Sequence, residues 1–319
     1  MTGQLFFGLL LSAVVGGLGY WRQALTLSGF VGAVLVGTLI FGFGGWIWGL
    51  LLITFFVSSS VLSHYRLADR GPVLLGTGAV AGKSAKGSSR DLGQALANGG
   101  VGAMLAVAFA IYPSPLFFAA FLGVIGTANA DTWATELGVL SRVPPRLITT
   151  GEEVSPGTSG GVTWLGIWAS VAGALLIGIV AMALTQIWAL LSGTGWMSQA
   201  VALVRTLSAI RTLSADTVNR LQPLVVSLPL LAVVGGLVGS LFDSLLGATV
   251  QGIYHCDHCA KETEHRFHVC GTRPGGHPPR RATTHLVRGW AWLNNDIVNL
   301  MASLLGGLVS AALAWLLWK

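Results

Sequence analysis

Long apolar segments are the feature that most limits how this chain can fold. Eight of them occur, at about 4–20, 28–43, 45–63, 93–112, 115–138, 162–191, 223–250 and 291–317. About 20 apolar residues suffice to cross a bilayer as a helix. Only 9% of the 319 residues are charged and the mean hydropathy is +0.72, whereas soluble domains have about 25% charged residues. We therefore expect one all-α domain over 1–319, a polytopic membrane helix bundle rather than a soluble enzyme, a disordered chain or a nucleic-acid binder.

The number of spans depends on the second and third segments. Both are short, and Gly42, Gly44 and Gly45 separate them. Eight transmembrane helices are expected, and seven if this pair forms a single bent hairpin.

The distribution of basic residues predicts the orientation. With eight spans, 14 of the 18 Lys and Arg residues fall on one side, at Arg22 and in the loops 64–92, 139–161 and 251–290. Short basic loops remain in the cytoplasm. We therefore expect these three loops to be cytoplasmic and both termini to lie on the opposite side. The net charge of +6 then reflects topology and requires no nucleic-acid partner.

Acidic residues within or beside the spans predict a functional site, because ionisable groups are costly in a membrane. In the segment 223–250, Asp243 continues a stripe of Gly235 and Gly239 at every fourth position, which lets another helix approach closely. Mg²⁺ takes oxygen ligands and usually joins one or two carboxylates to substrate phosphates. The predicted magnesium ligands are Asp131, Glu136, Asp243 and Asp296. The alternative is that these groups only hold helices together by hydrogen bonds.

Two of the basic loops have the composition of anion-binding segments. The stretch 81–91 is rich in Gly and Ser, carries Lys86 and Arg90, and precedes a helix. Its glycines do not fit the register of a P-loop and no βα unit surrounds it. The stretch 147–162 is rich in Gly, Thr and Ser just before another helix. Backbone amides in such loops bind phosphate oxygens.

Cysteine and histidine gather in the third basic loop. Cys256, Cys259, His268 and Cys270 have a spacing that fits a small structural zinc site within 255–271. The alternative is a set of ordinary reduced thiols.

Several polar motifs resemble those of one family of integral membrane proteins. They run in order from about residue 83 to 300, at 86–91, 94–100, 129–138, 145–150, 156–163, 239–251 and 295–299. The family includes the phytyl-phosphate kinase of plant and cyanobacterial vitamin E (tocopherol) synthesis and the animal transmembrane protein 19.

The resemblance implies an enzyme that phosphorylates an isoprenyl monophosphate, such as phytyl or geranylgeranyl phosphate, to the diphosphate with CTP or another nucleoside triphosphate and Mg²⁺. It also implies a protein of a bacterial inner or thylakoid-type membrane, with a lipid and a nucleotide as binding partners. Both a monomer and a homo-oligomer are compatible with it. The catalytic residues would be Asp131, Glu136, Asp243, Asn98 and Arg90. Phosphate would be bound by Lys86, Arg146, Thr150, Gly157, Thr158, Ser159, Gly160, Gly161, Asn295 and Asn299.

Two other classes of function remain open. Glycine-interrupted helices with intramembrane acids also occur in transporters. A lipid cytidylyltransferase would use the same site for Mg²⁺ and CTP but release pyrophosphate.

Overall fold

The computed structural model describes residues 2–69, 89–191, 215–258, 261–270 and 280–319. Its helices are α1 (Thr2–Trp21), α2 (Leu27–Leu39), α3 (Trp46–Asp69), α4 (Leu92–Ile111), α5 (Pro115–Gly138), α6 (Trp164–Leu191), α8 (Ala215–Thr249) and α9 (Asn295–Leu317). Within these ranges, eight helical segments are long and apolar enough to cross a membrane. The predicted helix bundle is confirmed.

The second and third spans are separate helices. A π-helical turn, η1 (Ile40–Gly44), extends α2 to the length of a span. The chain then reverses at Gly45, whose φ of +88° is favourable only for glycine. The structure therefore has the eight-span arrangement and not the single bent hairpin.

Polar residues at the helix starts explain where several helices begin. Ser114 caps α5 immediately before Pro115, and Asn294 caps α9. Asp91 and Gln94 form a capping box at the start of α4, each side chain accepting from the other residue's amide. Asp91 thus has a structural role at the helix terminus.

Helix α5 is the centre of the bundle and contacts α3, α4, α6, α8 and α9. Small residues allow these approaches. A Cβ on Gly123 would overlap the carbonyl of Gly306 in α9, and one on Gly126 would lie 2.8 Å from the carbonyl oxygen of Ala232 in α8. This packing is typical of helices that associate in lipid.

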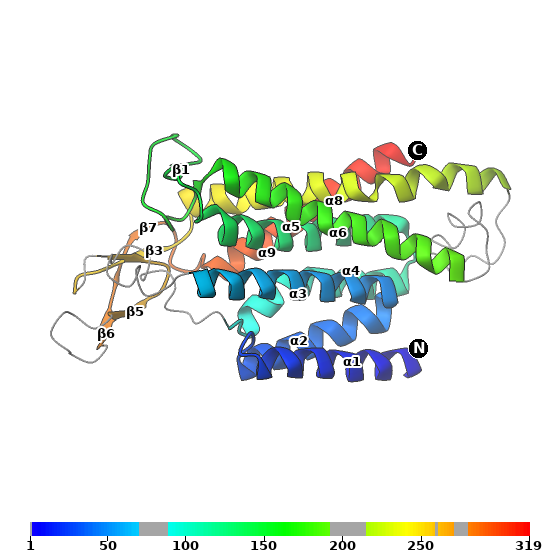
Figure 1. Ribbon diagram of the computed structural model, residues 1–319, viewed down its shortest axis with the longest axis horizontal. Helices are drawn as coiled ribbons and strands as arrows, with labels where there is room; N and C mark the ends of the chain where they lie inside the picture. Colours follow the sequence, from blue (N-terminus) through cyan, green and yellow to red (C-terminus); the bar gives the residue numbers. More distant parts are fainter. Residues whose placement is uncertain (1, 70–88, 192–214, 259–260, 271–279) are drawn as a thin grey trace.

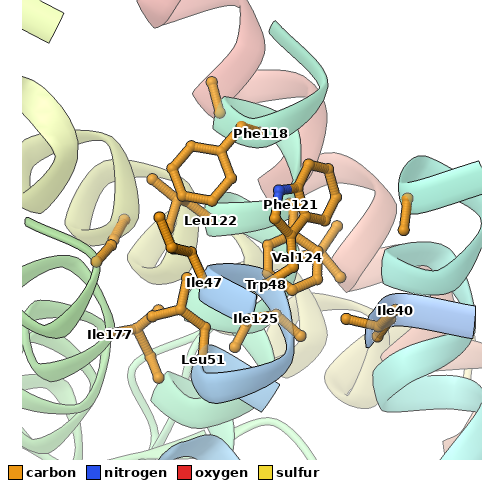
Figure 2. Packing of buried hydrophobic residues seen from close by; sticks show 14 of the residues in the cluster. Ile40, Ile47, Trp48, Leu51, Phe118, Phe121, Leu122, Val124, Ile125 and Ile177 are labelled. Carbon is orange, nitrogen blue, oxygen red and sulfur yellow. The ribbon is translucent and has the colours of Figure 1, made fainter. Parts of the chain in front are cut away.

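Aromatic side chains fill the space between α3, α4 and α5. Figure 2 shows Trp48 beside Phe118 and Phe121. The ring centroids of Trp48 and Phe121 are 4.4 Å apart, and Trp48 is 1% exposed. This cluster fixes α3 against α5.

Truncating Trp48 to alanine is expected to destabilise the protein by about 2–3 kcal/mol, because it opens a cavity in this cluster. The cost lies below the usual range for soluble proteins, since lipid also solvates apolar groups. Thermal unfolding in detergent measures it. Trp164→Ala is the matched control, because Trp164 is 78% exposed and its loss leaves no cavity.

Short strands lie in the connections at one end of the bundle. β1 (Arg146–Leu147) pairs with β2 (Gly161–Val162), β3 (Ile253–Cys256) lies between β4 (Lys261–Thr263) and β7 (His285–Arg288), and β5 (Phe267–Cys270) pairs with β6 (Arg280–Thr283). Figure 1 shows these strands at one end and both chain termini at the other. The strands were not predicted, and they fall in the loops 139–161 and 251–290.

Candidate functional site

Three helices meet in close contact at Thr127. Its hydroxyl donates to the carbonyl of Gly123 in its own helix at 2.8 Å and of Gly235 in α8 at 3.3 Å. A Cβ on Gly239 of α8 or on Gly306 of α9 would overlap that hydroxyl. The predicted role of the glycine stripe in α8 is confirmed.

One helical turn nearer the strand-bearing end, the same three helices carry polar residues. Four residues after Thr127, α5 carries Asp131, and four residues after Gly239, α8 carries Asp243. Helix α9 runs in the opposite direction (Figure 1), so Asn299 precedes its contact residue Ala302 by one turn. Oδ2 of Asp243 is buried from solvent. Two carboxylates and an amide therefore lie at the same depth.

The loop 155–161 packs over the end of this stripe. Gly160 has a φ of +81°, and a Cβ there would lie 2.5 Å from the amide nitrogen of Ala248 in α8. A Cβ on Gly247 would in turn lie 3.1 Å from the amide nitrogen of Gly160. Gly247 is one turn from Asp243. The glycine-rich loop predicted to bind phosphate is thus adjacent to the turn that carries Asp243.

The loop is also held from within and from the third basic loop. The amides of Thr158 and Gly161 donate to carbonyls of the loop itself, so they are not available to a ligand. The hydroxyl of Ser159 donates to Oε1 of Glu264 at 2.5 Å. Arg288 of β7 donates to the carbonyls of Gly247 and Ala248 and so caps α8.

Glu136 belongs to a different side of α5. It lies five residues after Asp131, which turns it about 140° around the helix axis. The Ser63 hydroxyl of α3 donates to its Oε1 at 2.8 Å. Asn129 also faces α3, where it accepts from Ser58 at 2.9 Å. This side of α5 holds α3 by polar contacts.

Arg90 lies beside the same face of α3. Its guanidinium carbon is 5.3 Å from the ring centroid of Phe55 and 5.8 Å from that of Phe56. Burial lowers the pKa of Arg90 to about 10, and the nearby Glu136 carboxylate opposes that shift. A pKa of about 10 keeps the guanidinium charged at neutral pH. Asn98 lines a cavity together with Arg90.

Asp296 lies in the first turn of α9, where it and Asp91 both come close to Gly93 of α4. Its Oδ2 is 2.5 Å from the position that a Cβ on Gly93 would take, so it lies against the first turn of α4. A negative charge is favourable at a helix N-terminus. Among the described residues, no three His, Cys, Asp or Glu side chains gather as metal ligands. The four predicted magnesium ligands are thus spread over three places.

The remaining predicted phosphate ligands differ in position. Arg146 forms an exposed ion pair with Glu153 at 2.9 Å, and Thr150 is exposed beside Glu152. Gly157 is exposed at the tip of its loop, and Asn295 is the first residue of α9. Lys86 lies outside the described residues. The structure therefore brings Ser159 and Gly160, but not Arg146 or Thr150, next to the turn of Asp243.

The predicted zinc ligands are only partly described. Cys256 is buried in β3. Cys259 lies outside the described residues, as do the side chains of His268 and Cys270. The zinc site stays a prediction.

Sequence reasoning missed several residues that hold the site together. Ser58 and Ser63 fix α3 to α5 by hydrogen bonds. In the sequence, only the run of serines at the end of the apolar segment 45–63 could have indicated such contacts. Glu264 and Arg288 act across contacts between distant loops, for which the sequence carries no local signal.

Comparisons with known proteins agree with this architecture. Residues 10–307 match the family described as integral membrane protein DUF92. Protein PGR of Arabidopsis thaliana is 32% identical over 262 residues, covering 78% of this chain and 79% of that protein. An uncharacterised membrane protein of Methanocaldococcus jannaschii is 31% identical over 176 residues, covering 55% and 69%. No solved structure matches the chain. The resemblance carried by the motifs is confirmed, and the chain belongs to the DUF92 family of integral membrane proteins.

Proposed function

We propose that this protein transfers the terminal phosphoryl group of CTP, or of another nucleoside triphosphate, to an isoprenyl monophosphate and so forms the diphosphate. The observation that carries the proposal is the close contact of α5, α8 and α9 at Thr127, Gly239 and Ala302, together with the packing of Gly160 against Ala248. Helical period then puts Asp131, Asp243 and Asn299 one turn from that contact. Phosphoryl transfer is mainly a matter of positioning and of neutralising charge.

The residues at this depth suit Mg²⁺. Asp131 and Asp243 supply two carboxylates and Asn299 an amide oxygen, and Mg²⁺ usually takes one or two carboxylates together with substrate phosphates. When bound, Mg²⁺ supplies the positive charge that brings the nucleotide phosphates together and neutralises them. In this proposal the loop that contains Ser159 and Gly160 orients the nucleotide on that side.

Arg90 is the best candidate to bind the phosphate of the acceptor. Its charged guanidinium is buried beside the rings of Phe55 and Phe56 and near Glu136, five residues along α5 from Asp131. A phosphate monoester with a second pKa near 6 is largely dianionic at neutral pH. The acceptor can therefore attack without a strong base, and the protein needs only to hold and orient it.

Product analysis with purified protein tests the proposal. Phytyl or geranylgeranyl phosphate is incubated with Mg²⁺ and CTP labelled in either the γ- or the α-phosphate. We expect γ-label, and no α-label, in a lipid diphosphate. Label from the α-position in the lipid, with release of pyrophosphate, would identify a cytidylyltransferase instead. Folded protein that labels no lipid from CTP, ATP or GTP would favour transport.

Replacing Arg90 by glutamine is expected to raise the KM for the lipid monophosphate about 10–100-fold, because it removes a charge-assisted hydrogen bond worth about 1.5–3 kcal/mol. The KM for the nucleotide should change far less. Arg142→Gln is the matched control, since Arg142 is exposed in the loop after α5. Equal effects of both variants on the lipid KM would contradict this role.

A further inference from the structure

A cavity of about 80 Å³ lies between α1, α2, α3 and α4. On the same measure one water molecule needs about 10–15 Å³, so the cavity has room for several. Its lining is almost entirely apolar and includes Ala33 from α2, Phe41 from η1 and Leu52 from α3. Apolar cavities remain dry and bind hydrocarbon in preference to water.

Two polar groups of the lining stand out. Nη1 of Arg90 and Oγ of Ser12 are both buried and have no hydrogen-bond partner within the described part of the chain. A buried polar atom without a partner is unfavourable unless a ligand completes it. The Arg90 atom is the stronger indication, because burying a charged donor costs more than burying a hydroxyl. An anion at this position would satisfy it.

The cavity extends from Arg90 into the membrane-spanning part of the bundle. The amide of Thr26, the residue that caps α2, donates to the carbonyl of Arg90 at 2.9 Å. Along α2 and η1 the lining runs from Ala33 to Phe41, away from that cap, a distance of about 12 Å. An elongated ligand with an anionic end at Arg90 would therefore place its body among apolar side chains of the spans.

We infer that this cavity binds the hydrocarbon chain of a prenyl monophosphate, with the phosphate at Arg90. The assignment rests on the proposed function for the identity of the acceptor. The cavity and the buried guanidinium together match a molecule that is charged at one end and apolar along its length. A nucleotide does not fit this description, because its ribose and base require polar partners. Asn98 lies on the same lining as Arg90 and is placed to orient the phosphate.

Photo-crosslinking of the folded protein tests the inference without requiring catalysis. The probe is geranylgeranyl monophosphate with a diazirine at the far end of the chain. We expect crosslinks on peptides of α1, η1 and α3 near Ser12, Phe41 and Leu52. Unlabelled geranylgeranyl monophosphate should reduce them at least 10-fold, and dioleoyl phosphatidic acid at the same concentration should not. Crosslinks confined to α6, α8 or α9, or equal displacement by phosphatidic acid, would overturn the inference.

A cavity-filling variant gives a second, independent test. Ala33→Phe places a ring in the cavity and is expected to reduce crosslinking at least 10-fold. Val31→Phe is the matched control, because Val31 is 55% exposed on the outer side of the same helix. If the protein is active, Ala33→Phe should raise the KM for geranylgeranyl phosphate at least 10-fold and that for isopentenyl phosphate less than 2-fold. Identical crosslinking of Ala33→Phe, Val31→Phe and the unmodified protein would contradict the assignment.

The two tests separate the inference from the proposed function. Crosslinks in the cavity without any phosphoryl transfer would leave the lipid site standing and refute the kinase. Phosphoryl transfer with crosslinks elsewhere would leave the kinase standing and refute the cavity.

Discussion

Replacing Asp243 by asparagine is expected to lower the rate of phosphoryl transfer about 10³-fold, comparable to removing one essential charge-stabilising group from other active sites. The change keeps the shape of the side chain and removes its charge. Oδ2 of Asp243 is buried, one turn from Gly247, where the loop 155–161 rests. If Asp243 holds Mg²⁺ as proposed, a neutral amide in its place would bind the ion more weakly.

Binding of the nucleotide should be lost together with the rate. In the unmodified protein, Mg²⁺ and CTP together should raise the temperature of unfolding, because a ligand that binds only the folded state stabilises it. With Asp243→Asn this rise should disappear, while the unfolding temperature without ligand changes little. Asp257→Asn is the matched control, since the side chain of Asp257, just after β3, is 77% exposed. Asp243→Asn with normal turnover would exclude a role of this carboxylate in the reaction.

The spans could be predicted from the sequence because each depends on a local property. Hydropathy and length identify a membrane helix without knowledge of its neighbours. The stripe of Gly235, Gly239 and Asp243 was informative for the same reason, since helical period alone places these residues on one face. Their packing against Thr127 and Gly306 agrees with that prediction.

The composition of the site could be predicted only in part, because it depends on which helices are neighbours. Asp131 and Glu136 are predicted from the sequence as ligands of one magnesium site, although their spacing turns them about 140° apart around the axis of α5. Only the structure shows that one side meets α8 and α9 and the other meets Ser63 of α3. The position of Asp296 against Gly93 likewise depends on the contact between α4 and α9.

The strands escaped prediction for a different reason. They are two to four residues long, and their pairs form across loops, as in β3 with β7. Such short polar segments carry no period that marks them as strands. The contact between Ser159 and Glu264, which joins two of these loops, was equally invisible.

Replacing Gly160 by alanine is expected to lower activity at least about 100-fold with little loss of global stability. The new Cβ would lie 2.5 Å from the amide nitrogen and 2.6 Å from the Cα of Ala248. These are backbone atoms of α8 and cannot move aside, so the loop must lift away from the turn that carries Asp243. A shift of about 1 Å in a positioning element can cost on the order of 10²-fold in rate.

Gly151→Ala separates this clash from backbone strain. Gly151 also has a positive φ, +73°, but nothing lies within 4 Å of its Cβ position. Both variants thus carry the cost of alanine at positive φ, about 1 kcal/mol, and only Gly160→Ala also overlaps α8. Turnover and the temperature of unfolding should be measured for both. We expect near-normal turnover in Gly151→Ala and a large loss in Gly160→Ala, because of these two glycines only Gly160 packs against α8. Equal activity of the two variants would show that the packing of Gly160 against Ala248 of α8 is not required for catalysis.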